Sequence, residues 1–236
     1  MLATRTAGVT VDVVILTIRH GELSVLLVER DGPPIDGRWA LPGRFIDAHE
    51  DLDVAAGRVL ARHAGAGQPP SGGHLEQLRT YGAPDRDPRR RVVSVAYLGL
   101  FPGLPDVDGR GAQPGRWLPI DELAPPAGCG SLVLAFDHGV IVADGVERAR
   151  SKLEYSSLAT AFCEEPFTLA DLRRVYEIVW GVRLDVPNFR RKVLTTPGLV
   201  EGLGRRAVAA SGGRPAELYR RGGARQLHPA MLRPCL

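Results

Sequence analysis

The first thirty residues carry two apolar runs separated by a short polar segment. The runs cover residues 9–18 and 23–28, and the segment between them, Arg-His-Gly-Glu, has the composition of a tight turn. Apolar runs of this length on either side of a turn are typical of two adjacent β-strands. We therefore predict a strand pair at the start of the chain.

A different periodicity governs residues 168–180. Apolar side chains recur there at helical spacing and share one face, as follows: Leu172, Val175, Tyr176 and Val179. Thr168 is placed to cap the start of this segment and Gly181 to end it. The pattern predicts an amphipathic helix that faces a core.

A second helix is predicted after a short connection at residues 182–185. Its apolar residues Phe189 and Val193 lie at i, i+4 spacing, whereas a basic run, Arg190, Arg191 and Lys192, points mostly outward. Two helices and a tight turn form a helix-turn-helix candidate, whose second helix enters the major groove of DNA.

Within that second helix, Asn188 and Arg190 lie near its start, and we expect them to contact bases. We assign Arg191 and Lys192 to phosphates or the minor groove. Residues 199–202 and 216–220 bracket a Gly- and Arg-rich stretch and predict a β-hairpin wing. Its tip carries Arg214 between residues that allow close approach, which suits a phosphate or a narrow minor groove.

The segment from Leu-Pro-Gly at 41–43 to Gly65 resembles a Nudix box, G-x5-E-x7-R-E-U-x-E-E-x-G-U. It keeps Glu50, Arg58, Leu60 and Gly65 at the right spacing. The first glycine position holds Arg44, and the three glutamate positions hold Val59, Arg62 and His63. Magnesium takes hard oxygen ligands, and an arginine side chain stays protonated, so this set would repel the ion. We predict no metal, no cofactor and no catalytic residues; a chance match is the alternative.

Arg44 and Arg62 would then neutralise a ligand pyrophosphate directly through bidentate hydrogen bonds. With Glu50 and Arg58, they make up the predicted ligand-binding set. An equally weighted alternative is that both arginines are surface residues that accumulated after catalysis was lost.

Charge separates the two halves of this 236-residue chain. Residues 1–146 hold 14 Arg and 18 Asp or Glu, a net charge of −4. Residues 147–236 hold 16 Arg or Lys and 9 Asp or Glu, a net charge of +7. We therefore predict a sensing domain at 1–146, a helical junction at 147–165 and a nucleic-acid-binding domain at 166–236. Residues 132–155 are expected to form a helix or a helix pair, and hence a stiff junction.

The chain has no apolar run near 20 residues and no charged-then-apolar leader. These features predict a cytoplasmic protein that does not enter a membrane. Its three cysteines, Cys129, Cys163 and Cys235, form no CxxC pair, and we expect free thiols.

Four weaker candidates each have a simpler structural explanation. Residues 89–91, all arginine, would contact a ligand phosphate or merely end a strand. His63 would bind a transition metal only with partners that the sequence does not supply. Trp39 would stack on an adenine, although a core position is the better interpretation. Lys152 would lose its charge on acetylation, but nothing in the sequence distinguishes it from other lysines.

Most of the chain resembles one family, the Nudix-related transcriptional regulators of NAD metabolism called NrtR. The resemblance extends over residues 8–222, and its matching pieces lie at 75–82, 87–97, 135–138, 152–155, 188–192 and 213–216. It implies an α+β fold, in which an N-terminal Nudix α/β/α sandwich is followed by a C-terminal winged helix-turn-helix domain.

In function, the resemblance implies a homodimer that binds palindromic operators near genes of NAD synthesis and salvage, usually as a repressor. It also implies that ADP-ribose or a related metabolite modulates DNA binding. Two alternatives remain open. One is a weakly active hydrolase of the ADP-ribose pyrophosphatase type with a docking domain, and the other is a ligand-binding adaptor that contacts RNA or protein.

Overall fold

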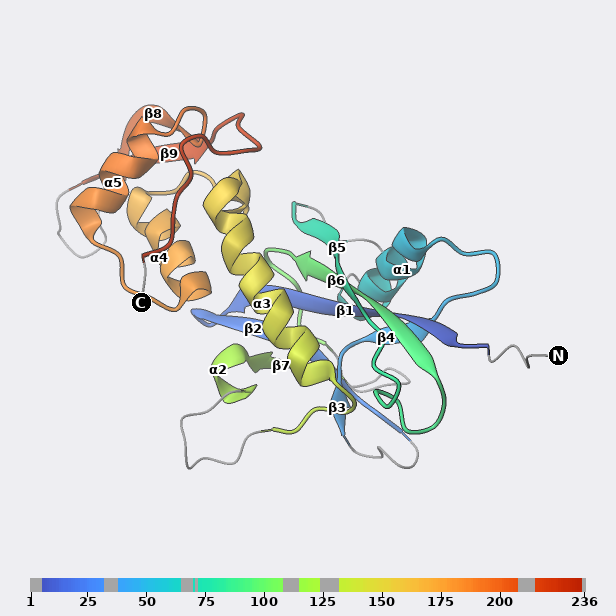
Figure 1. Ribbon diagram of the computed structural model, residues 1–236. Helices are drawn as coiled ribbons and strands as arrows, with labels where there is room; N and C mark the ends of the chain where they lie inside the picture. The colour runs from blue at the N-terminus through green and yellow to red at the C-terminus, as the bar shows by residue number, and fades with distance from the viewer. Residues whose placement is uncertain are drawn as a thin grey trace. The chain divides into compact units, whose positions relative to one another are not determined.

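The computed structural model describes residues 6–31, 38–64, 70, 72–107, 115–123, 132–207 and 215–234. The chain divides into two compact units. The first comprises Met1–Arg19 and Leu23–Arg148, and the second comprises His20–Glu22 and Ala149–Leu236. Figure 1 shows the elements of both units along the chain.

The first unit is built on a sheet that has seven strands in the described part of the chain. They are β1 (Gly8–Arg19), β2 (Glu22–Glu29), β3 (Trp39–Ala40), β4 (Gly43–Phe45), β5 (His74–Tyr81), β6 (Val92–Leu100) and β7 (Gly115–Pro119). The main order is β3-β2-β1-β6-β5, with β4 added to β1 and β7 to β2. β1 and β6 run parallel at the centre. The predicted strand pair is confirmed as β1 and β2.

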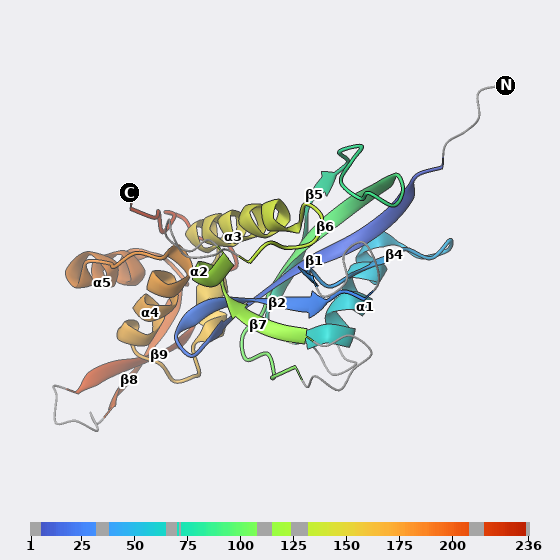
Figure 2. The ribbon, with the colours of Figure 1, turned by 90° about the horizontal axis from the view of Figure 1, so that it is seen from below.

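Helices cover both faces of this sheet. Val13 on one face of β1 joins a core cluster with Val59 and Leu60 of α1 (Leu52–Ala64). Successive strand residues point to opposite faces, and Val14 meets α3 (His138–Tyr155) at Gly145. Figure 2 shows α1 and α3 on opposite sides of β1 and β6. The first unit is therefore the predicted α/β/α sandwich; the short α2 (Ile120–Leu123) follows β7.

The helix predicted from residue 132 begins only at His138, so its expected start is wrong by six residues. Two features keep the preceding segment out of a helix. The amide of Ala135 donates to the carbonyl of Trp39 at 2.8 Å, and Phe136 has a left-handed backbone with φ 57°. From His138, α3 runs without interruption through the division between the units, which falls after Arg148.

The second unit contains η1 (Ser157–Phe162), α4 (Leu169–Trp180), α5 (Val186–Thr195), β8 (Val200–Ala207) and β9 (Ala216–Arg221). Thr168 caps α4 in a reciprocal capping box with Asp171, and Gly181 ends it at φ 69°, as predicted. The ring of the buried Tyr176 packs on Trp180 and on Phe189 of α5, with centroids 4.7 and 5.6 Å away.

β8 and β9 pair antiparallel after these helices, so the unit has the predicted helix-turn-helix followed by a hairpin. The tip of the hairpin, with Arg214, lies outside the described residues. Across the segments that the structure describes, no helix has the length and apolar character that a bilayer span requires.

Candidate functional site

The loop before α1 gathers several charged side chains of the Nudix-like segment. Arg58 donates to the Asp47 carboxylate at 2.8 Å and also to Glu50, whose carboxylate accepts from the Asp47 amide at 3.3 Å. Arg44 reaches Asp47 at 3.2 Å. The hydrogen bond from Arg58 is the main cause that lowers the pKa of Asp47. Three of the four predicted ligand-binding residues are thus linked through Asp47, which the sequence analysis had not selected.

The positions where a Nudix box has glutamates lie in three different environments on α1. Val59 is buried in the core, whereas Arg62 is exposed. His63 is half-buried, and burial, aided by the charge of Arg62, lowers its pKa to about 4. Among the described residues, no group of three or more His, Cys, Asp or Glu side chains is arranged to hold a metal ion. None of these three positions supplies a carboxylate.

A small hollow of about 50 Å³ lies in the first unit, beside the start of α3. Its described lining combines four arginines, two phenylalanines and a few polar or small residues: Thr10, Asp12, Arg30, Gly43, Arg44, Phe45, Arg86, Asp87, Arg89, Val92, Phe136 and His138. Guanidinium groups and flat rings together suit an anionic ligand that carries an aromatic base. At this volume a whole nucleotide does not fit unless side chains at the rim move.

Of the predicted ligand-binding residues, only Arg44 lines this hollow. Its guanidinium donates to the carbonyl of Phe45 at 3.2 Å and to Asp47. Arg62 is not among the lining residues.

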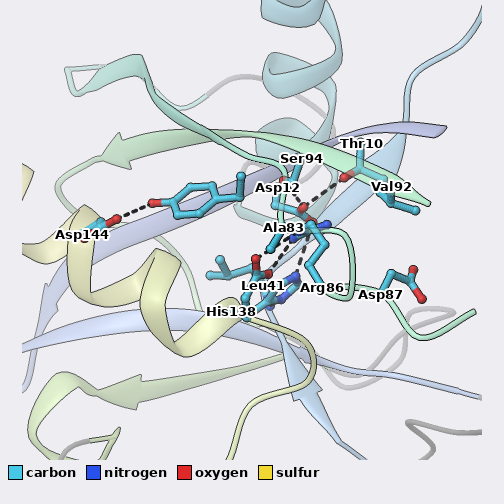
Figure 3. A network of polar contacts seen from close by, with 12 residues as sticks. Thr10, Asp12, Leu41, Ala83, Arg86, Asp87, Val92, Ser94, His138 and Asp144 are labelled. Carbon is cyan, nitrogen blue, oxygen red and sulfur yellow. Dashed lines mark hydrogen bonds and ion pairs between the residues drawn. The ribbon is translucent and has the colours of Figure 1, made fainter. Parts of the chain in front are cut away.

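A buried polar network supports the wall of the hollow (Figure 3). The carboxylate of Asp12 accepts hydrogen bonds from Thr10 at 3.2 Å and from Ser94. The Nδ1 atom of His138 accepts from the amide of Leu41 at 2.8 Å, and its Nε2 atom lies 3.9 Å from Asp12. Burial lowers the pKa of His138, so the ring is neutral at pH 7. Because Nδ1 accepts the hydrogen bond from Leu41, the single ring proton is on Nε2, toward Asp12.

Carboxylates and rings hold the arginines around the hollow. Arg86 binds Asp137 through two hydrogen bonds of 3.0 and 2.7 Å, and Figure 3 shows Arg86 near His138. Arg89 binds Asp87 at 2.9 and 2.8 Å, which lowers the pKa of that carboxyl, and lies 5.2 Å from the ring of Phe136. These guanidinium groups are therefore fixed in orientation before any ligand arrives.

The three consecutive arginines have separate surroundings. Arg89 lines the hollow, Arg90 lies 4.1 Å from the ring centroid of Phe45, and Arg91 donates to the carbonyl of Ala83 at 3.0 Å. Trp39, considered above for adenine stacking, is half-buried on β3 and does not line the hollow. Arg30 and Arg86 were not predicted from the sequence; a signal for this region was the lone carboxylate of Asp12 within an apolar strand.

In the second unit, α5 exposes two of its three basic residues. Asp185 caps the helix by accepting from the amide of Asn188 at 2.9 Å. Asn188, Arg190 and Arg191 are exposed, and Arg191 donates to the side chain of Asn188 at 2.8 Å. Lys192 is half-buried. The inward positions of Phe189 and Val193 are confirmed, since both are buried.

Next to α5, the hairpin contributes further charged groups. Arg205 and Arg206 of β8 are exposed; from the sequence they were expected only as part of an Arg-rich stretch. Glu217 of β9 lies 3.9 Å from the guanidinium of Arg190. The unit thus joins an exposed basic helix to a basic strand, an arrangement suited to a polyanion.

Comparison with protein families assigns both units. Residues 159–221 match the NrtR DNA-binding winged helix domain, and residues 6–131 match the NUDIX domain. The chain is 33% identical to the ADPR responsive transcriptional repressor NtrR of Acinetobacter baylyi, over 89% of this chain and 80% of that protein. It is also 31% identical to an ADP-ribose pyrophosphatase of Methanocaldococcus jannaschii, over 51% of this chain and 64% of that protein.

Two solved structures are similar as well. One is Shewanella oneidensis NrtR complexed with a 27mer DNA, at 32% identity and TM-score 0.71, covering 90% of this chain and 93% of that one. The other is the NUDIX domain of the same protein complexed with ADP ribose, at 31% identity and TM-score 0.50. That match covers 61% of this chain and 90% of the domain.

Proposed function

The chain belongs to the NrtR family of Nudix-related transcriptional regulators, and we propose that it is a DNA-binding repressor of genes for NAD synthesis or salvage. Its N-terminal unit would sense ADP-ribose or a related NAD metabolite. The observation that carries this proposal is the similarity to an ADPR responsive repressor along 89% of the chain, which includes both units together.

The second unit supports the DNA-binding half of the proposal. Residues 147–236 carry 16 basic and 9 acidic residues, and α5 exposes Asn188, Arg190 and Arg191. A recognition helix reads bases through residues near its N-terminus, while neighbouring cations bind phosphates. We assign base contacts to Asn188 and Arg190, and phosphate or minor-groove contacts to Arg191, Lys192 and Arg214.

The hollow of the first unit supports the sensing half. Its arginines would bind the pyrophosphate of ADP-ribose, and the rings of Phe45 and Phe136 would contact the adenine. We place Arg44 at the pyrophosphate, since it lines the hollow. Arg62 remains a second candidate on α1. Glu50 and Arg58 would act by holding the loop that carries Arg44, through their shared contacts with Asp47.

We propose that the first unit does not hydrolyse its ligand. The Nudix fold implies a magnesium ion, but the residues at its usual positions do not fit one. Val59 is buried and apolar, Arg62 is cationic, and Glu50 already binds Arg58. Incubation with ADP-ribose and excess Mg²⁺ or Mn²⁺ should release no AMP above a control without protein. Turnover that Glu50→Gln abolishes would support the hydrolase alternative instead.

Gel shifts at two salt concentrations test the DNA-binding half. The full chain should bind one duplex, selected from a random-sequence library, far more tightly than a mixed-sequence duplex of equal length. Binding to both should fall with salt, because phosphate contacts release counterions, while the preference for the selected duplex should persist. Equal binding to the two duplexes would favour the adaptor alternative.

Calorimetry without magnesium tests the sensing half. ADP-ribose should bind, because arginines rather than a metal would neutralise its pyrophosphate. Arg44→Glu and Arg62→Glu are compared with Arg116→Glu, a charge reversal on β7 that lies outside the hollow lining. The arginine hypothesis would be refuted if ADP-ribose bound only in the presence of magnesium. It would also be refuted if neither Arg44→Glu nor Arg62→Glu weakened ADP-ribose binding.

A further inference from the structure

A groove of about 520 Å³ lies within the second unit, between the helices and the hairpin. Its described lining comes from α4, α5, β8 and β9 and their flanks: Thr168, Leu169, Ala170, Arg173, Val186, Phe189, Arg190, Arg206, Pro215, Ala216, Glu217 and Tyr219. Three of these residues are arginines. Glu217 is the one acidic residue among those described, so a single carboxylate faces a basic groove.

A hydrogen bond from the buried Tyr219 holds this carboxylate in position. The hydroxyl of Tyr219 donates to Oε2 of Glu217 at 2.8 Å, and Tyr219 is only 3% exposed. The backbone of Tyr219 is held in turn by Phe167, through an amide–carbonyl bond in each direction at 3.0 and 2.8 Å. Because two backbone hydrogen bonds hold Tyr219, its hydroxyl is a fixed donor for the Glu217 carboxylate.

Glu217 has one arginine neighbour on α5 and another on β8. The guanidinium of Arg190, on α5, is 3.9 Å from the same Oε2 atom. Arg206 of β8 is the direct strand partner of Glu217, and side chains of directly paired residues project from the same face of a sheet. Both arginines line the groove with Glu217.

We infer that Glu217 is a specificity-determining residue of the DNA-binding surface. Through the ion pair at 3.9 Å, its charge attracts one side of the Arg190 guanidinium and leaves the other donors of that residue available for a base edge. Its negative charge also repels a phosphate from the position next to Arg190 and Arg206, which disfavours binding that depends on the backbone alone. The inference rests on the proposed DNA-binding function and goes beyond it in assigning discrimination to a carboxylate.

Glu217→Gln tests this inference in the full-length protein, because it removes the charge and keeps a hydrogen-bond acceptor for Tyr219. A matched control is Glu201→Gln, since Glu201 is similarly exposed, pairs with Arg220 at 2.7 Å and lies outside the groove lining. Affinities are measured by fluorescence anisotropy at several salt concentrations. The probes are a duplex that the wild-type chain selects from a random library and a mixed-sequence duplex of the same length.

We expect Glu217→Gln to bind the mixed-sequence duplex roughly three- to fivefold more tightly, with a steeper salt dependence, and to gain little or lose affinity on the selected duplex. Tyr219→Phe should shift the ratio of the two affinities in the same direction, and the two changes together should not add. Glu201→Gln should leave the ratio near the wild-type value.

Equal changes on both duplexes, or an effect of Glu217→Gln no larger than that of Glu201→Gln, would overturn the inference. Failure of the wild-type chain to select any duplex is a different result, because it contradicts the proposed function. The mixed-sequence measurements still compare the two glutamine variants in that case, and unchanged binding by Glu217→Gln would overturn the inference on its own.

Discussion

Arg190 and Lys192 lie two residues apart on α5, yet their surroundings differ. The side chain of Arg190 is 56% exposed beside Glu217, whereas Lys192 is half-buried in the last turn of the helix. Arginine recognises a guanine edge by a bidentate geometry that lysine lacks, and a lysine near the backbone acts as a point charge.

Arg190→Ala should therefore cost about 1–3 kcal/mol on the selected duplex, with little loss on mixed-sequence DNA. Lys192→Ala should weaken binding to both duplexes and flatten the salt dependence, because one phosphate contact is lost. Quantitative gel shifts with each duplex measure both effects. If neither substitution changed binding, the assignment of α5 as the recognition helix would have to be abandoned.

His63 predicts a pH dependence of stability. Its pKa falls from an ordinary 6.5 to about 4 in the folded chain, mainly because of burial. Between these two values the unfolded chain binds the proton and the folded chain does not. Stability therefore decreases as the pH falls from about 6.5 to about 4, by at most one proton's contribution, roughly 1.4 kcal/mol per pH unit.

Urea denaturation at pH 7 and pH 5 measures this effect in the wild type and in His63→Gln. The variant should lose less stability than the wild type on acidification, and the remaining loss includes His138, whose pKa is also lowered by burial. Identical pH dependence in the two proteins would show that His63 titrates normally in the folded chain.

At the level of single residues, the sequence predicted which side chains are buried when the burial depends only on their spacing along one helix. Phe189 and Val193 were expected inward and are buried. The hollow was not predictable in this way, because Asp12, Arg86 and His138 come from distant positions and meet only through the sheet order. Nor does the box spacing alone show that Arg44 lines the hollow while Arg62 does not.

Among the elements, α3 comes close to strand β1 at Gly145. A side chain at Gly145 would place its Cβ atom 2.9 Å from Cγ1 of Val14, whereas nothing lies within 4 Å of a Cβ at Gly139 on the same helix. Gly145→Ala should therefore force α3 away from β1 and destabilise the protein by about 1–3 kcal/mol. Gly139→Ala should be neutral or stabilise by up to about 1 kcal/mol, because alanine favours a helix.

Thermal unfolding of the full chain distinguishes these two glycine variants. A lower melting temperature for Gly145→Ala alone is the expected result. Equal melting temperatures for the two would mean that α3 does not pack against β1 as closely as the distance indicates.

Elements with a local signature were predicted well from the sequence. α4 has its cap at Thr168 and its stop at Gly181, and the turn between β1 and β2 separates two long apolar runs. The start of α3 was misplaced because its determinants are not local. The apolar residues at 132–136 fit a helix, but a hydrogen bond to Trp39 and the left-handed conformation of Phe136 prevent one.

For the whole molecule, the two units make a prediction about the operator. A homodimer would present two copies of α5 to one face of a duplex, so the selected sequence should be roughly palindromic. Its half-sites should lie about one or two helical turns apart. Sequencing the duplexes recovered from a random library measures the spacing directly. A single, asymmetric half-site in the recovered pool would contradict binding as a symmetric dimer.

The molecule also has a covalent route between its proposed sites, because α3 belongs to both units. Its first residue, His138, lines the hollow, and its last turn lies in the second unit. A ligand that contacts the start of α3 can bias DNA binding only if its affinity differs between two states of the protein. Such coupling is typically worth about 1–3 kcal/mol, or roughly 5- to 150-fold in affinity.

ADP-ribose should therefore change the affinity for the selected duplex by a factor in this range, in one direction or the other. Thermodynamic linkage requires the duplex to change the affinity for ADP-ribose by the same factor. Two titrations, DNA with and without saturating ADP-ribose and ADP-ribose with and without saturating DNA, measure the two factors independently. If ADP-ribose binds but leaves the DNA affinity unchanged, the first unit is not a sensor for the second. A ligand with equal affinity for both states does not shift the equilibrium between them.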